Sequence, residues 1–217
     1  MSEPVKGRTE AGRRREERAR RRRQRVVDTA LRLFLERGYV ATTIEAIARE
    51  AAVAPATIYQ AFGSKQAILA RVLDQAIAGD AEPAALLDRD WVKQAARQAD
   101  SRQRLGLVIQ HTSQVAARTA PIKEVMRDAA AGDPAVRQLL YEDDQRRYLT
   151  QQILVEHVIG VGALRAGCDL DHAVVTFFAT VNSHCYRLLA GQLGWSLADW
   201  QLWLTGVLGR ELLGTSP

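Results

Sequence analysis

Four neighbouring side chains, Ala56, Thr57, Tyr59 and Gln60, carry chemistry suited to contacts with duplex DNA. The Gln60 amide can donate to and accept from the edge of an adenine, and Ala56 and Thr57 can touch a thymine methyl group. The Tyr59 hydroxyl can bond to a phosphate oxygen, although its ring could instead pack inside the domain. These residues can act together only if the surrounding elements hold them on one outward surface.

The first of those elements is a helix that begins before Val27 and ends at Gly38. Val27, Ala30, Leu31 and Phe34 follow the i, i+3, i+4, i+7 spacing that gives a helix one apolar face. A glycine directly after such a pattern is typical of a helix end. The sequence therefore predicts a helix with its apolar face in a small core.

Two shorter helices are expected to follow. In the first, Thr42 is predicted to cap the free amides while Glu45 reaches back, and the apolar face is Ile44, Ile47, Ala48 and Ala51. The second begins at Pro55, and Ile58 and Phe62, four residues apart, face the core. This leaves residues 56, 57, 59 and 60 outside. Two helices with a tight joint match a helix-turn-helix, whose second helix enters the major groove.

At this point the segment resembles the DNA-binding domain of the TetR family of bacterial transcriptional regulators, over about a fifth of the chain. The family usually has glycine at position 52, often at 56, and a serine-like cap at 54, where this chain has alanines. An alanine at a turn that requires positive φ is strained. The matching residues are Ala30, Leu31, Phe34, Arg37, Gly38, Thr42, Thr43, Ile44, Ile47, Ala48, Ala51, Val53, Thr57, Ile58, Tyr59, Phe62, Ser64 and Lys65.

The resemblance implies an all-α protein with an N-terminal three-helix DNA-binding domain and a larger helical domain for effector binding and dimerisation. We expect a basic, disordered arm over residues 1–20, the DNA-binding domain over 21–68 and the larger domain over 69–217. Phosphate contacts are expected from Thr43, Tyr59 and Lys65, and Thr42 is also expected among the DNA-binding residues. Ala56, Thr57 and Gln60 are expected to read bases.

Basic residues are concentrated at the N-terminus. Residues 1–25 contain eleven basic residues and four glutamates, a net charge of +7, whereas the whole chain carries +5 and the remainder is therefore at −2. Arg13, Arg14 and Arg15 are predicted to enter a minor groove beside the reading helix. Residues 13–25 could be a disordered arm, the start of the first helix, or both depending on DNA. The alternative is a solvated run of charge.

The rest of the chain is predicted to be helical, with about six further helices. Breaks are expected at 80–83, 119–121, 132–134, 160–169 and 191–196, where glycine, proline and capping residues gather. The helices 170–190 and 197–213 carry more apolar residues than one face can hold, which favours a homodimer, although a monomeric core could also bury them. The resemblance implies a four-helix bundle between subunits, through Val174, Val181, Cys185, Trp200, Trp203, Leu204 and Val207.

The resemblance also implies an effector pocket in the middle helices, about residues 91–158. The sequence identifies no ligand, but soft and polar side chains among apolar ones suit a small, mostly apolar molecule. Side chains of this kind are more often ordinary packing or surface, and for the two phenylalanines dimer contact is the stronger interpretation. The candidates are His111, Gln114, Met126, Tyr141, Phe177 and Phe178.

The sequence shows no enzyme, cofactor or metal signature. Gly160, Gly162 and Gly167 do not have dinucleotide-loop spacing, and the four histidines and two cysteines lack zinc-site spacing. No secretion signal or membrane span is predicted, so we expect a bacterial cytoplasmic protein, associated with the nucleoid when bound to DNA.

These observations predict a ligand-responsive homodimeric transcriptional regulator, a repressor that binds a palindromic operator and is released by a small effector. The alternative is a DNA-binding accessory protein with a helical dimerisation domain and no small-molecule site. A helical enzyme would need a polar constellation that the sequence does not contain.

Overall fold

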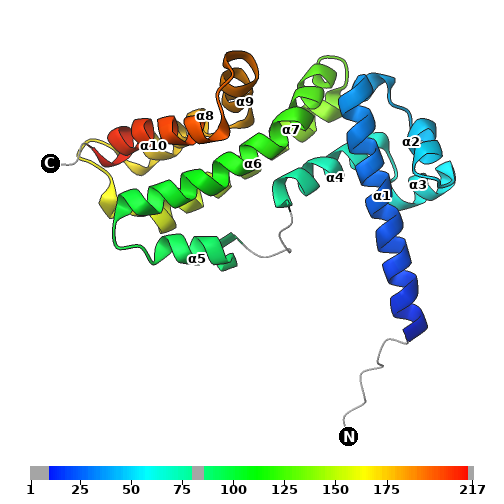
Figure 1. The fold of residues 1–217 in the computed structure, drawn as a ribbon, viewed down its shortest axis with the longest axis horizontal. Helices are drawn as coiled ribbons and strands as arrows, with labels where there is room; N and C mark the ends of the chain where they lie inside the picture. Colours follow the sequence, from blue (N-terminus) through cyan, green and yellow to red (C-terminus); the bar gives the residue numbers. More distant parts are fainter. Residues whose placement is uncertain (1–9, 80–85, 215–217) are drawn as a thin grey trace, which may run out of the picture. The chain divides into compact units, whose positions relative to one another are not determined.

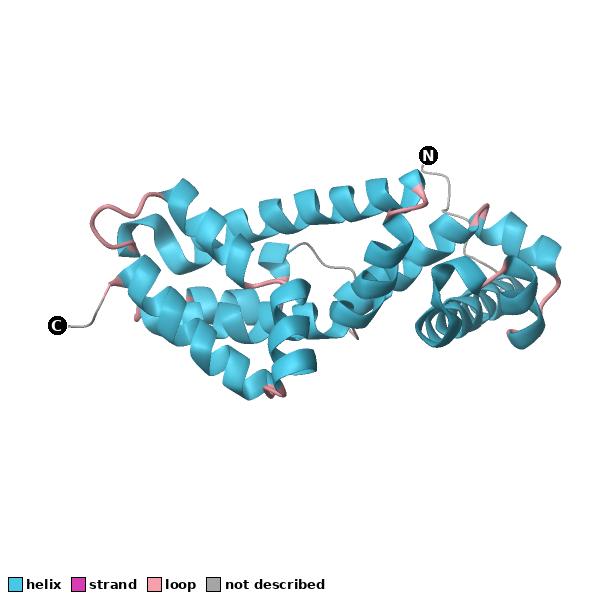
Figure 2. Cartoon of the chain, turned by 90° about the horizontal axis from the view of Figure 1, so that it is seen from above, coloured by secondary structure: helices cyan, strands magenta, loops and turns pink. Residues whose placement is uncertain are grey.

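The computed structural model describes residues 10–79 and 86–214, and this part of the chain consists of helices joined by turns and loops, without a strand (Figures 1 and 2). The predicted all-α fold is confirmed. The α-helices are α1 (Glu10–Ala41), α2 (Ile44–Glu50), α3 (Pro55–Phe62), α4 (Lys65–Ala78), α5 (Asp90–Ala96), α6 (Ser101–Ala130), α7 (Pro134–Ile153), α8 (Leu170–Thr180), α9 (Ser183–Tyr186) and α10 (Leu197–Leu213). Short 3₁₀ turns occupy η1 (Leu86–Asp88) and η3 (Val161–Ala163), and wider π-helical turns occupy η2 (Leu154–Gly160) and η4 (Arg187–Gln192).

The chain divides into two compact units, residues 1–72 and 73–217, and α4 runs through the boundary. In the smaller unit, helices α1, α2 and α3 bury their apolar faces against one another. Phe34, Ile47 and Ile58 are almost fully buried, as the sequence predicts. The Phe34 and Tyr39 rings lie 5.6 Å apart, so Tyr39 extends this core at the end of α1.

The joints of the smaller unit follow the predicted pattern with one correction. Gly38 leaves the helical region with φ 77°, and Ala52 adopts φ 52°, the strained conformation expected for an alanine at a glycine position. The cap of α2, however, is Thr43, whose side chain accepts from the Ala46 amide. Thr42 is buried, and its hydroxyl donates to the Leu33 and Gly38 carbonyls. The prediction that Thr42 caps α2 is therefore wrong.

Helix α1 begins at Glu10, so residues 10–20, predicted as part of a disordered arm, are helical, while residues 1–9 lie outside the described residues. Glutamates one turn from arginines offset the repulsion between like charges. The Glu17 carboxylate accepts from Arg20 at 3.0 Å and from Arg21 at 2.8 Å. These hydrogen bonds lower the pKa of Glu17 to about 2.

In the larger unit, the long helix α6 packs against α5, α7, α9 and α10 and supplies the centre of the core (Figure 1). The largest buried side chains of this core include Trp200, Phe177 and Leu105. The break predicted at 119–121 is wrong, because α6 continues through Pro121. Ala120 and Ile122 on either side are buried, so tertiary packing outweighs the lost backbone hydrogen bond.

The helix predicted over residues 170–190 is broken at Val181 and Asn182, which separate α8 from α9. Asn182 caps α9, since its side-chain oxygen accepts from the His184 and Cys185 amides. The predicted breaks at 132–134, 160–169 and 191–196 are present, with caps at Asp133, Asp169 and Ser196. The break expected at 80–83 lies outside the described residues.

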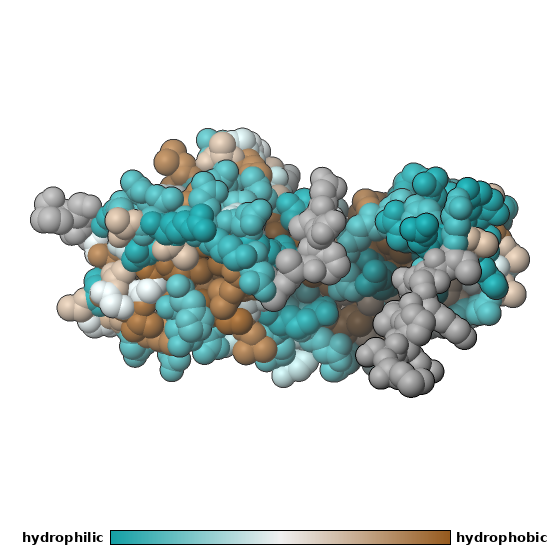
Figure 3. Space-filling model, turned by 90° about the horizontal axis from the view of Figure 1, so that it is seen from below, coloured by the Kyte–Doolittle hydropathy of each residue, from teal (hydrophilic) through white to brown (hydrophobic). Residues whose placement is uncertain are grey.

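Four of the residues expected at a dimer interface are instead buried within the chain. Val174, Val181, Trp200 and Leu204 are at most 1% exposed and pack in the core of the larger unit. Cys185, Trp203 and Val207 stay partly accessible. The resemblance implied that all seven take part in the interface, but the buried stripe of α10 runs through positions 200, 204, 208 and 212. Figure 3 shows that apolar side chains nevertheless reach the surface of this unit.

Candidate nucleic-acid interface and ligand cavity

Helix α3 presents an outward surface made by the residues that the sequence selected. Ala56, Tyr59 and Gln60 are exposed and Thr57 is half-exposed, whereas Ile58 is buried and holds the helix on the domain. The Ala54 cap makes no side-chain hydrogen bond, and Pro55 starts the helix as expected. The Tyr59 side chain is not packed inside, because the residue is 48% exposed.

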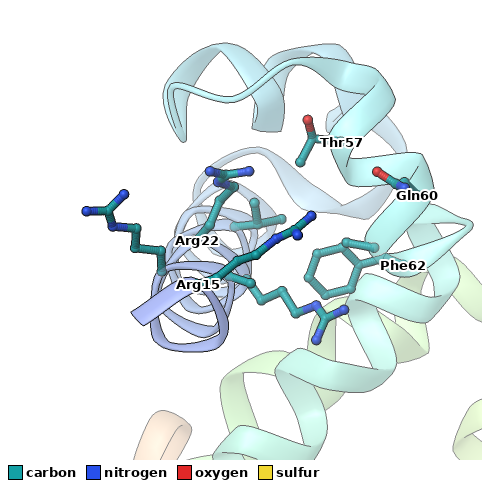
Figure 4. Close-up of a pocket in the computed structure, with 10 residues that line it drawn as sticks. Arg15, Arg22, Thr57, Gln60 and Phe62 are labelled. Carbon is teal, nitrogen blue, oxygen red and sulfur yellow. The ribbon is translucent and has the colours of Figure 1, made fainter. Parts of the chain in front are cut away.

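A hollow of about 680 Å³ separates the N-terminal half of α1 from α3. Arginines from α1 line one side and Thr57, Gln60 and Phe62 line the other (Figure 4). Of the predicted arm residues Arg13, Arg14 and Arg15, only Arg15 lines the hollow. The other lining arginines are Arg18, Arg22 and Arg23.

The sequence analysis missed those three arginines, although their spacing contains the signal. Val26 is buried, and residues four and seven positions before it, Arg22 and Ala19, lie on the same face of a helix. Counting a further turn back reaches Arg15. The expectation of a disordered arm hid this periodicity, because a helical face exists only where the helix continues.

Two predicted DNA-binding residues have structural roles. Thr42 is fully buried, so its side chain cannot touch DNA, and that prediction is corrected. The Lys65 ammonium donates to the Tyr39 carbonyl at 2.9 Å and to the Thr42 carbonyl at 3.0 Å, and lies 4.1 Å from the centre of the Tyr39 ring. Lys65 therefore fastens the start of α4 to the end of α1. Thr43 is exposed at the start of α2.

An ion-pair cluster joins α1 to α2. Glu50 accepts from Arg32 and, at 2.9 Å, from Arg37. The hydrogen bond from Arg32 is the main cause of the lowered pKa of Glu50. These ion pairs connect the two helices at the surface of the head.

The larger unit contains a cavity of about 610 Å³, within the usual range for small-molecule sites. Helices α6 and α7 form its walls, together with the α8–α9 break, the end of α4 and the η1–α5 segment. Of the residues proposed from the sequence, His111 and Gln114 line it. Met126 and Phe177 are buried away from the cavity lining, Tyr141 is exposed, and Phe178 packs outside the lining.

One end of this cavity is aromatic. The Trp91 and His111 rings stack at 4.4 Å with an angle of 16° between their planes. Burial, and then the nearby charge of Arg118, lower the pKa of His111. The imidazole is therefore neutral at pH 7 and serves as a flat, weakly polar surface.

Further along the cavity, charged groups are buried. The Lys123 ammonium contacts the Asp143 carboxylate, and both residues are at most 5% exposed. Asp144 lies 3.8 Å from Lys123, and Arg146 lies 3.8 Å from Asp143. A buried pair of this kind is retained only when its charges compensate one another.

Arg147 ties the α8–α9 break to α7. It donates to the Phe178 carbonyl at 3.0 Å, and its guanidinium lies 3.6 Å from the centre of the Phe178 ring. Gln151 donates to the Val181 carbonyl at 3.1 Å. These bonds satisfy backbone acceptors that the end of α8 leaves without helical partners. Burial lowers the pKa of Arg147.

No group of histidine, cysteine and acidic side chains suited to a metal ion occurs within residues 10–79 and 86–214. In the same ranges, none of the helices combines the length and the apolar character needed to span a bilayer. The two cysteines are free.

The geometry defines the class of the protein: a helix-turn-helix head followed by a larger helical unit with a ligand-sized cavity. Residues 26–72 match the model of the bacterial regulatory proteins of the tetR family. The HTH-type transcriptional regulator HbdR of Aromatoleum sp. (strain CIB) is 52% identical over 48 residues, 22% of this chain and 21% of HbdR. YvkB of Bacillus subtilis, an HTH-type transcriptional regulator of uncharacterised role, is 40% identical over 52 residues, 24% of this chain and 28% of YvkB.

Solved structures share the fold over nearly the whole chain. NalD, the secondary repressor of the MexAB-OprM multidrug efflux pump in Pseudomonas aeruginosa, has a TM-score of 0.68 at 17% identity, covering 91% of this chain and 98% of NalD. FadR of Bacillus subtilis, solved with stearoyl-CoA, has a TM-score of 0.64 at 20% identity, covering 89% and 99%. A regulator from Saccharomonospora viridis, solved with choline, has a TM-score of 0.63 at 23% identity, covering 88% and 97%.

The predicted TetR-type DNA-binding segment is confirmed over residues 26–72, and over the rest of the chain the similarity to TetR-family structures is one of fold. Its relatives are regulators and not enzymes. The sequence match spans only 21% of the length of HbdR and 28% of the length of YvkB, and the structural matches, all below 25% identity, establish the fold.

Proposed function

We propose that the protein is a ligand-responsive homodimeric repressor that binds a palindromic operator and is released by a small molecule. The observation that carries this proposal is the combination, in one chain, of an outward α3 facing an arginine-lined hollow and a ligand-sized cavity in the other unit. The homologous head supports DNA binding, and neighbours solved with choline and stearoyl-CoA support a small-molecule effector.

In this proposal, Gln60, Thr57 and Ala56 contact base edges, and Thr43 and Tyr59 contact phosphates. The arginine face of α1, lined by Arg15, Arg18, Arg22 and Arg23, runs beside the same DNA. A helix there acts through phosphates and the groove edge, since a continuous helix does not thread a narrow minor groove as an extended arm does. Arg13 and Arg14 remain candidates for phosphates beyond the hollow.

The arginine face is tested by the salt dependence of DNA binding. Each lost phosphate contact should reduce the slope of log K against log salt by about 0.9. Replacing Arg18 and Arg22 by alanine should therefore flatten the slope by up to about 2. A matched control replaces Arg20 and Arg21, which both pair with Glu17 and do not line the hollow. Equal slopes in both variants would contradict the assigned face.

Dimerisation is proposed through accessible apolar residues of α8 and α10. Val175 is 53% exposed, Leu202 75% and Trp203 38%, which is unusual for large apolar side chains on neighbouring helices. A short reading helix touches few bases, so two heads related by a twofold axis are needed for a specific site. Leu202→Glu should shift the protein towards monomer in sedimentation, whereas Leu149→Glu on the exposed face of α7 should not.

Release by the effector would be a shift of population between two conformations. The ligand must bind the DNA-incompetent form more tightly, because equal affinity for both forms leaves the equilibrium between them unchanged. Helix α4 begins in the head and ends at the cavity, where Arg118 donates to the Ala76 and Ile77 carbonyls, each at 3.2 Å. A ligand that changes the position of Arg118 therefore acts on the end of α4.

Footprinting on the DNA that flanks the gene of the protein tests the proposal, followed by titration with cell extracts. Protection of a palindrome, lost on addition of a small-molecule fraction, is the expected result. No protected palindrome would refute the repressor. A protected site that no extract releases would favour the alternative, an accessory DNA-binding protein without an effector, which the cavity of about 610 Å³ argues against.

A further inference from the structure

The lining of the larger unit's cavity is strongly cationic. Five basic side chains line it against two carboxylates, Asp74 and Asp143, and His111 is neutral at pH 7. The lining therefore carries a net charge of +3. The basic residues are Arg89, Arg118, Lys123, Arg146 and Arg147.

Both carboxylates are already engaged by other members of this set. Asp143 contacts the buried Lys123 and lies 3.8 Å from Arg146. Asp74 lies 3.9 Å from Arg146. Among the residues that the structure describes, no carboxylate lies within ion-pair distance of Arg89 or Arg118.

Two guanidinium groups of the lining also contain buried donors without acceptors. The Nε–H groups of Arg89 and Arg147 are shielded from solvent and have no hydrogen-bond partner in the described part of the chain. Buried donors in proteins nearly always have a partner, which can be a ligand oxygen. Guanidinium groups match carboxylates and phosphates because their N–H groups form a planar fork.

The aromatic end sets the shape of the rest of the ligand. Arg118 follows His111 by seven residues on α6, which is about 10 Å along the helix axis. Trp91, Leu86 and Leu154 add apolar surface to the lining. An anionic head near Arg118 and Arg89 would thus leave its apolar body against the Trp91–His111 stack.

We propose that the cavity binds an organic anion, a carboxylate or phosphate ester with an aromatic or aliphatic body, held by Arg89 and Arg118. The inference rests on the proposed function, whose effector it specifies. The sequence predicts a mostly apolar effector; the structure assigns the apolar part to its body and adds an acidic head. A quaternary ammonium such as the choline bound by one neighbour is disfavoured by the same charges.

Three matched probes test the charge preference: phenylbutyrate, phenylbutanol and phenylbutylamine, which share one body and differ in the head. Calorimetric titration of the full chain should give a dissociation constant at least about tenfold lower for the anion than for either other probe. Arg89→Met and Arg118→Met should each remove most of that preference. Arg97→Met, an exposed arginine after α5, should keep it.

Arg118 also bonds to the end of α4, so thermal unfolding of each variant must accompany the titration. Arg89 makes no such bond, and its variant decides the question if Arg118→Met is unstable. The proposal is overturned if the alcohol or the amine binds as tightly as the anion, if no probe binds at millimolar concentration, or if Arg89→Met retains the full preference.

Failure of this inference is distinguishable from failure of the regulator. A protein that protects an operator but prefers the amine or the alcohol stays a regulator with a different effector. A protein that prefers the anion but protects no DNA has the proposed cavity chemistry and lacks the proposed function.

Discussion

The buried pair of Lys123 and Asp143 provides the sharpest test of the larger unit. Lys123→Met keeps most of the side-chain volume and removes the cation, leaving the Asp143 carboxylate at 3% exposure. Breaking a buried pair by removing one partner costs about 3–5 kcal/mol. Because Arg146 lies 3.8 Å from Asp143 and compensates part of its charge, we expect the lower end of that range.

For a chain of this size, a loss of about 3 kcal/mol lowers Tm by about 6–12 °C. Thermal unfolding of the full chain, followed by circular dichroism at neutral pH without ligand, measures the shift. The double variant Lys123→Met with Asp143→Leu should return to within about 1 kcal/mol of the original protein, since an apolar replacement of both partners removes the unpaired charge.

The matched control is Lys93→Met. Lys93 lies 3.8 Å from Asp88, but the two side chains are 47% and 72% exposed, so the pair contributes at most about 1 kcal/mol. If Lys123→Met destabilises the protein no more than Lys93→Met does, the pair is solvated and the reasoning fails. A double variant as unstable as the single would show that packing, and not charge, is lost.

Four further predictions concern the head. Ala52→Gly removes the steric strain of an alanine at positive φ and should stabilise the head by about 0.5–1 kcal/mol in denaturant unfolding. An unchanged stability would show that the alanine is not strained. Lys65→Met should destabilise the head by about 2 kcal/mol, because the hydrogen bonds to the Tyr39 and Thr42 carbonyls are lost. The same variant should weaken binding to all DNA sequences equally. Gln60→Ala should instead relax the preference at one base position per half-site. The pKa of Glu17 is lowered to about 2, so the Glu17 carboxylate stabilises α1 above pH 4.5 and loses this effect as the pH falls towards 2. The helicity of the N-terminal segment should therefore decrease over this pH range. A constant helicity would refute the prediction.

The head was predictable from sequence because its signals are local. Gly38, Pro55 and the alternation of buried Ile58 with exposed Gln60 each specify a backbone position or a helix face within a few residues. The errors arose where a distant contact decided between local options. Thr42 turns to the carbonyls of α1 instead of capping α2, and nothing within three residues of it distinguishes the two bonds.

The cavity was less predictable, because its lining comes from segments that are distant in sequence. His111 and Gln114 were identified, but the sequence analysis did not select Arg89, Arg118 and Arg147, which also line the cavity. The break at Val181 was also missed, because the side chains that stabilise it lie about thirty residues away in sequence. Arg147 donates to the Phe178 carbonyl and Gln151 donates to the Val181 carbonyl. At Pro121 the sequence predicted a break that is absent, because packing maintains α6 through this residue.

Arg118 has only five N–H groups, and two of its nitrogens already serve the last turn of α4. An acidic guest in the cavity would compete with those peptide oxygens for the same donors. Occupancy and the integrity of that last turn would then be thermodynamically linked, so fraying of α4 at Ala76 and Ile77 would itself report on ligand concentration.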